Sequence, residues 1–173
     1  MARIFLTGYM GAGKTTVGKK LANQLKLKFI DLDHSIEDAS GKTVQQWFDT
    51  EGEELFRLKE SEVLKNVCES DDFVLATGGG TPCYSENLEL MKRSGITIYL
   101  ELHPGSIYYR LARSKAERPL IKSLDDASLM EYILSSMLVR EPFYKKSHII
   151  VKGENVDVPA LKDMVLVQMQ GAS

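Results

Sequence analysis

The sequence predicts an α/β protein of three layers, with a central five-stranded parallel sheet and helices on both faces. Five short apolar runs alternate with segments of helical periodicity, which is typical of parallel βαβ units. Glycine clusters follow the first and third runs directly, where loops at one edge of such a sheet are expected. The 173 residues, 43% hydrophobic and 27% charged, are enough for a single domain, 1–173, with its own core.

The predicted strands are short and apolar. The first covers residues 4–6 and stops before Gly8. The other four are expected at residues 28–32, 73–77, 96–100 and 148–151.

The predicted helices lie between these strands. Val17, Leu21 and Leu25 are four residues apart and indicate a helix over 14–25. The pattern T-E-G-E at 50–53 is typical of a capping box, and we expect it to open the next helix. Trp47 and Phe48 are interpreted as core residues. Further helices are expected at 85–93, at 105–113, at 127–145, where Pro142 should end or kink the helix, and after Asp157.

Residues 8–15, GYMGAGKT, match the phosphate-loop pattern G-x-x-x-x-G-K-S/T between a predicted strand and a predicted helix. Glycines allow backbone N–H groups to surround phosphate oxygens, and the following helix N-terminus favours anions. Lys14 can reach the β- and γ-phosphates of a nucleotide, and the Thr15 hydroxyl can bind Mg²⁺. The base-reading motif N-K-x-D of GTPases is absent from the sequence, so these features favour a small-molecule kinase. The nucleotide-binding residues predicted in this loop are Gly11, Ala12, Gly13, Lys14, Thr15 and Thr16.

Two carboxylates follow the second predicted strand. Alternation along the strand would place Asp31 and Asp33 on one side, where they could serve a metal-bound water and a substrate hydroxyl. The alternative is that Asp33 is the N-cap of a helix.

Two further groups have a functional and a purely structural interpretation. Arg57 and Glu60 share a helix face and form either part of a binding site or a surface ion pair. The three glycines 78–80 follow the third strand and indicate close approach of the backbone to a ligand, or a flexible turn.

Residues 115–126 are polar, lack periodicity and are predicted to form a long exposed loop that acts as a mobile lid. With few apolar anchors, the loop should be mobile without ligands. Arg118 within it could supply positive charge to a transferring phosphoryl group, or could be a solvated loop residue. Arg140 could belong to a site or could stabilise a helix C-terminus.

The charge pattern argues against some classes of partner. Net charge is −2, and no basic run is interleaved with aromatic residues, so we expect no nucleic-acid partner. No apolar stretch approaches the ~20 residues that cross a bilayer, and no signal peptide is recognised. Cys68 and Cys83 lack metal-ligand spacing and are expected to be free thiols. We expect a cytoplasmic monomer without membrane association.

Taken together in order, these motifs resemble those of shikimate kinases over nearly the whole chain. The resemblance is carried by GYMGAGKTT from Gly8, DLD at 31–33, IE at 36–37, Gly41, GE at 52–53, FR at 56–57, Glu60, GGG at 78–80, RPL at 118–120 and REPFY at 140–144. It implies a nucleoside-monophosphate-kinase-like fold with a substrate-binding subdomain at 33–60 and a lid at 115–126. It also implies ATP-dependent phosphorylation of the 3-hydroxyl of shikimate, with Mg²⁺, in aromatic amino-acid biosynthesis.

The resemblance also implies roles for individual residues. Lys14 and Arg118 would act on the phosphates, and Thr15 and, through water, Asp31 would act on magnesium. Asp33 would hold the substrate hydroxyls and orient the attacking one. The shikimate carboxylate and ring would contact Arg57, Arg140, Gly78, Gly79 and Gly80, and adenine would pack on Arg110.

Ile121 follows Arg118-Pro119-Leu120 where a second leucine is common, and Thr15-Thr16 replaces the commoner Ser-Thr. The rival hypotheses are a related kinase for another small polar substrate, such as gluconate, and a nucleotide-binding regulatory module without catalysis.

Overall fold

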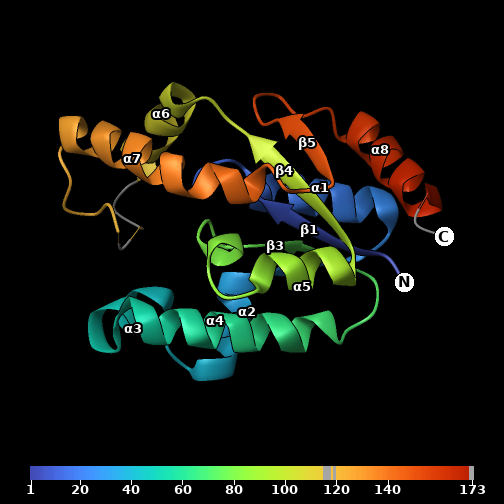
Figure 1. The fold of residues 1–173 in the computed structure, drawn as a ribbon, viewed down its shortest axis with the longest axis horizontal. Helices are drawn as coiled ribbons and strands as arrows, with labels where there is room; N and C mark the ends of the chain where they lie inside the picture. The colour runs from blue at the N-terminus through green and yellow to red at the C-terminus, as the bar shows by residue number, and fades with distance from the viewer. Residues whose placement is uncertain (115–117, 119, 172–173) are drawn as a thin grey trace.

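The computed structural model describes residues 1–114, 118 and 120–171. Five strands form one sheet in the order β2-β3-β1-β4-β5, and every neighbouring pair is parallel (Figure 1). The predicted sheet is therefore confirmed. The strands are β1 (Arg3–Thr7), β2 (Lys28–Asp31), β3 (Phe73–Ala76), β4 (Ile96–Glu101) and β5 (Ile149–Lys152).

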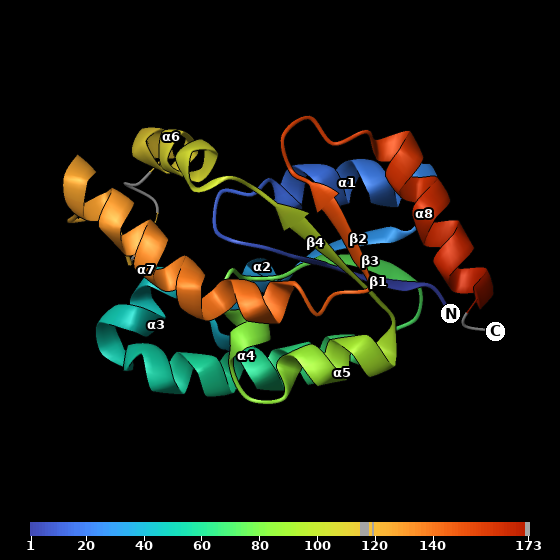
Figure 2. The ribbon, with the colours of Figure 1, turned by 45° about the horizontal axis from the view of Figure 1, so that its top comes forward.

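Helices cover both faces of this sheet, as predicted. Figure 2 shows α1 and α8 on one face and α4 and α5 on the other. The helices are α1 (Lys14–Leu25), α2 (Leu32–Ser40), α3 (Val44–Thr50), α4 (Gly52–Cys68), the 3₁₀ turn η1 (Thr81–Cys83), α5 (Asn87–Ser94), α6 (Pro104–Ser114), α7 (Asp126–Tyr144) and α8 (Val158–Gly171).

Alternation along β1 divides the core into two. Ile4 and Leu6 pack in a cluster with residues of α1 and α8, whereas Phe5 packs in a second cluster with residues of α4 and α5. All three side chains are fully buried, because a central parallel strand is covered on both sides. Phe5 also meets Phe73 of the neighbouring strand edge to face, with ring centroids 5.4 Å apart.

The predicted capping box at 50–53 is wrong. The Thr50 hydroxyl donates to the Gln46 carbonyl inside α3, and α4 begins at Gly52, which has φ 82°, without a side-chain cap. The capping box lies seven residues earlier, where Thr43 and Gln46 bond reciprocally and open α3. The sequence contains the same signature twice, and the prediction missed α3 by choosing the second.

Proline 142 lies inside α7, and the helix ends two residues later at Tyr144. The helix therefore passes through Pro142 and does not end at the proline itself. Helix α7 starts at Asp126, and the Asp125 carboxylate accepts from the Ser128 N–H at 2.8 Å.

Residues 115–117 and 119 of the predicted lid lie outside the described residues. In the described part of this loop, Ile121 is fully buried, and Leu120 and Leu124 pack against the same core. The expectation of few apolar anchors is therefore wrong for its second half, and lid motion stays a prediction. Among the described helices, none is both long and apolar enough to cross a bilayer.

Candidate functional site

The phosphate loop connects β1 to α1, as predicted. Gly8, Gly11 and Gly13 have φ values of 142°, 78° and 94°, in the region that residues with a Cβ rarely occupy. A Cβ on Gly8 would lie 2.9 Å from the Leu100 carbonyl oxygen of β4. The glycines thus allow the loop to turn tightly in front of the N-terminus of α1, where an anion is favoured.

Lys14 is the first residue of α1 and lies against this loop. Its Nζ donates to the carbonyls of Gly8 at 2.8 Å and Tyr9 at 2.9 Å. Burial, followed by the charge of Arg118, lowers the Lys14 pKa to about 7. A triphosphate in front of the loop would offset both effects and restore the ammonium charge.

Asp31 ends β2 and is the N-cap of α2, accepting from the Asp33 N–H at 3.1 Å. The alternative prediction, that Asp33 is the N-cap of this helix, is therefore wrong. Strand alternation does not relate Asp31 to Asp33 either, because α2 starts between them at Leu32. The other oxygen of Asp31 accepts from the Thr15 hydroxyl at 3.0 Å. A hydroxyl and a carboxylate at this spacing are the hard oxygen donors that Mg²⁺ takes beside nucleotide phosphates.

Asp33 is the second residue of α2; water reaches its side chain, but the surrounding protein removes part of its hydration. Loss of hydration, then the nearby carboxylates of Asp31 and Glu60, raise its pKa to about 6, and Lys14 acts in the opposite direction. Asp33 is therefore charged at neutral pH but titrates close to it, which suits a group that accepts a hydroxyl proton.

Two adjoining cavities meet at these carboxylates. The first, of about 360 Å³, is lined by the phosphate loop with Arg110 and Ser114, and we call it the phosphate cavity. The second, of about 650 Å³, is lined by residues of α2, α3, α4 and α7, and we call it the acceptor cavity. Residues that line both are Met10, Asp31, Asp33, Gly78, Gly79 and Arg118.

Arg57 and Glu60 form a buried pair at the base of the acceptor cavity. Arg57 Nη1 donates to Glu60 Oε2 at 2.9 Å, and the Thr81 hydroxyl donates to the other oxygen of Glu60 at 2.6 Å. Glu60 is fully buried and Arg57 is 7% exposed, which excludes a surface ion pair.

The Arg57 guanidinium is held on two further sides. Nε and Nη2 donate to Glu53 Oε1 at 3.3 and 3.1 Å, and the Tyr84 ring lies 4.3 Å below the guanidinium carbon. The Tyr84 hydroxyl also donates to Glu53, at 3.0 Å. Glu53 and Tyr84 were not predicted. The four-residue spacing of Glu53 and Arg57 was a signal for the first, but nothing local indicated Tyr84.

The three glycines are packed too closely for a merely flexible turn. A Cβ on Gly80 would lie 2.4 Å from Arg57 Nη2, and one on Gly79 would lie 3.1 Å from the Met10 nitrogen. The Tyr144 hydroxyl donates to the Gly79 carbonyl at 2.5 Å and fixes this segment from α7. The loop therefore presents its backbone to both cavities.

The remaining arginines also line the cavities. Arg140 is 7% exposed, lies over the Tyr9 ring and lines the acceptor cavity. Arg110 Nη1 donates to the Gly11 carbonyl at 3.1 Å and lines the phosphate cavity. Arg118 lines both cavities. Arg140 is therefore no solvated surface charge, whereas Arg110 lines its cavity from an exposed position. Phe48, predicted as core, lines the acceptor cavity while it packs on the core.

This geometry agrees with comparisons to known proteins. The family model "Shikimate kinase" matches residues 10–168. The chain belongs to the shikimate kinase family. It is therefore a kinase, as predicted, and the resemblance inferred from its motifs is confirmed.

Relatives within the shikimate kinase family cover almost the whole chain. The shikimate kinase of Phocaeicola vulgatus is 45% identical over 91% of this chain and 90% of its own length. The crystal structure of shikimate kinase from Bacteroides thetaiotaomicron has 40% identity and a TM-score of 0.85 over 99% of this chain and 97% of its own. That of Acinetobacter baumannii, in complex with shikimate, has 33% identity and a TM-score of 0.85 over 100% and 95%.

Proposed function

We propose that this chain transfers the γ-phosphoryl group of ATP to the 3-hydroxyl of shikimate, yielding shikimate 3-phosphate and ADP. The observation that carries the proposal is the junction of the two cavities at Asp33, with the phosphate loop on one side and buried arginines on the other. Family membership and the shikimate-bound relative support shikimate over gluconate as the acceptor.

ATP would bind in the phosphate cavity. The N–H groups of 11–16 and Lys14 would surround the β- and γ-phosphates, and Arg110 would pack near the adenine. Thr15 would bind Mg²⁺ directly and Asp31 through water. The metal would neutralise charge on the phosphates when bound.

Shikimate would bind in the acceptor cavity. Arg57 and Arg140 are buried cations that would match one carboxylate, and the backbone of Gly79 and Gly80 would border the ring. Asp33 would accept hydrogen bonds from adjacent hydroxyls. All these groups belong to one chain, which supports action as a monomer.

The transfer itself then needs three contributions from the chain. Asp33 holds the attacking hydroxyl and takes its proton, since its pKa of about 6 leaves it ionised at neutral pH. Arg118 borders both cavities and can bridge the oxygens of the transferring group. Lys14 keeps the phosphates in register with the hydroxyl.

The test is ADP release from ATP and Mg²⁺ with shikimate, with gluconate and with neither. We expect strong stimulation by shikimate alone. Arg57→Ala and Arg140→Ala should each weaken shikimate binding by roughly 2–5 kcal/mol without changing ATP binding. Higher turnover with gluconate, or normal shikimate binding by both variants in calorimetry, would refute the proposal.

A further inference from the structure

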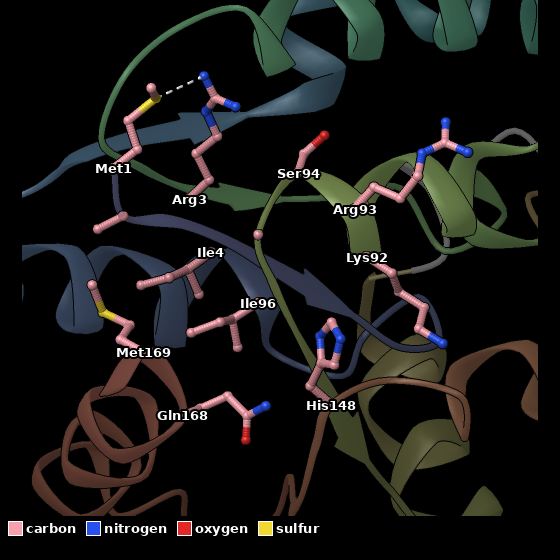
Figure 3. A pocket seen from close by; sticks show the side chains of 12 residues that line it. Met1, Arg3, Ile4, Lys92, Arg93, Ser94, Ile96, His148, Gln168 and Met169 are labelled. Atoms are coloured by element: carbon pink, nitrogen blue, oxygen red, sulfur yellow. Dashed lines mark hydrogen bonds between the residues drawn. The ribbon is translucent and has the colours of Figure 1, made fainter. Parts of the chain in front are cut away.

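Another cleft lies at the opposite edge of the sheet from the two cavities described above. Strands β1, β4 and β5 begin there, and helices α5 and α8 end there (Figure 3). Its volume is about 390 Å³, within the range of small-ligand pockets. Because the candidate active site lies at the carboxyl ends of the strands, this amino-edge cleft is separated from it by the length of β1.

The floor of the amino-edge cleft is apolar. Ile4 and Ile96, from adjacent strands, lie between Met169 of α8 and the ring of His148 in Figure 3. Met1 extends this surface on the side of Ile4. Ile4 is fully buried beneath this floor and Ile96 is 8% exposed, so the apolar surface that water reaches belongs mainly to half-buried Met169. A hydrated inorganic ion would leave that surface uncovered, whereas a ring or a short alkyl chain would bury it.

The rim is basic. Lys92, Arg93 and Arg3 line the cleft together with His148, and the lining contains no aspartate or glutamate. Arg3 is already engaged by the Ser70 carbonyl at 2.8 Å. Neither Lys92 nor Arg93 forms an ion pair within the described part of the chain. The C-terminus of α5 favours basic residues, but a helix terminus does not neutralise the lysine charge.

His148 supplies a hydrogen-bond donor beside this lysine. Its Nδ1 accepts from the Thr97 N–H at 3.1 Å, so the proton of the neutral ring lies on Nε2. Burial, followed by the charge of Lys92, lowers the His148 pKa and keeps the ring neutral at pH 7. Nε2 makes no hydrogen bond within the described part of the chain.

We propose that the amino-edge cleft binds a small organic anion, whose carboxylate contacts Lys92 and His148 and whose apolar body lies on Met169 and the exposed edge of Ile96. A cationic rim above an apolar floor selects such a ligand over a neutral molecule of the same shape and over inorganic phosphate. This binding is independent of the proposed phosphoryl transfer.

Histidine NMR can test the proposal on the full chain, because the sequence holds only His34, His103 and His148. Benzoate is the probe, benzyl alcohol is its neutral counterpart and inorganic phosphate lacks the apolar body. We expect benzoate to shift the His148 ring signal saturably. His34, which lines the acceptor cavity, and His103 serve as internal controls.

Matched variants then locate the charge. Lys92→Gln should weaken benzoate binding about tenfold or more, since one charge-assisted hydrogen bond is lost. Lys65→Gln, an exposed lysine on α4, should leave it unchanged, with equal melting temperatures as the check on folding. Four results would each overturn the proposal. The NMR results are the absence of a saturable shift at His148 and a shift confined to His34. The binding results are equal binding of benzyl alcohol or phosphate and unchanged benzoate binding by Lys92→Gln.

Discussion

Removal of the Glu60 carboxylate should destabilise the protein far more than removal of an exposed carboxylate on the same helix. In Glu60→Ala, Arg57, whose side chain is 9% exposed, would keep only Glu53, which is 42% exposed, and the Thr81 hydroxyl would lose its acceptor. Breaking a buried pair on one side costs roughly 3–5 kcal/mol, and the remaining Glu53 contact places the expected loss near 3. For a chain of this length, that corresponds to a fall of roughly 6–12 °C in melting temperature.

Urea denaturation and thermal melting would measure this loss. The matched control is Glu62→Ala, which removes an exposed partner of Lys59 and should change the free energy of unfolding by less than about 1 kcal/mol. The double variant Arg57→Met/Glu60→Ala should recover part of the stability, because the uncompensated buried charge is gone. A Glu60→Ala loss as small as that of the control, or strictly additive losses in the double variant, would refute this reasoning.

Three further predictions concern the site. ATP affinity should fall as pH rises above 7, because the Lys14 pKa of about 7 must rise when the phosphates bind. Calorimetry in two buffers of different ionisation enthalpy should show proton uptake on ATP binding, and Lys14→Met should abolish this uptake. Shikimate affinity should fall about tenfold per pH unit below 6, because Asp33 becomes protonated. The variant Asp33→Asn should flatten this pH profile, whereas the control His34→Gln should keep it. An unchanged profile in Asp33→Asn would contradict the assignment. Arg118→Lys should lower kcat by about 100-fold with little change in ATP affinity, because lysine lacks the planar fork; normal turnover would show that Arg118 has no role in transfer.

The sheet was predictable because each strand overlaps a short, largely apolar run, and each predicted run is followed by a glycine or a polar residue. Helix α3 was not, since Thr43 and Thr50 both begin a capping-box pattern, and only the structure shows that Thr43 caps α3 whereas Thr50 lies inside it. Likewise, alternation placed Asp31 and Asp33 near one another, but it could not show that α2 begins between them.

The candidate site was predictable where one segment carries the chemistry. The phosphate loop and the glycines 78–80 lie where the motifs indicated, at the carboxyl ends of β1 and β3. The surroundings of Arg57 were not predictable, because Tyr84 approaches it from a segment beyond β3. Whether a charged side chain is buried depends on such contacts between residues that are distant in the sequence. The local sequence pattern therefore could not exclude a surface ion pair between Arg57 and Glu60.

The strand order itself accounts for the meeting of the two cavities. In the order β2-β3-β1, the loops that follow β1 and β3 leave the sheet side by side, about 4.8 Å apart at the strands. Gly79 consequently approaches Met10 so closely that a Cβ would lie 3.1 Å from its nitrogen. β2 adds Asp31 and, two residues later, Asp33 at the start of α2, on the far side of β3. The distance between a bound phosphate and a bound hydroxyl would thus be set mainly by hydrogen-bonded strands, and Arg118 already borders both cavities in this structure.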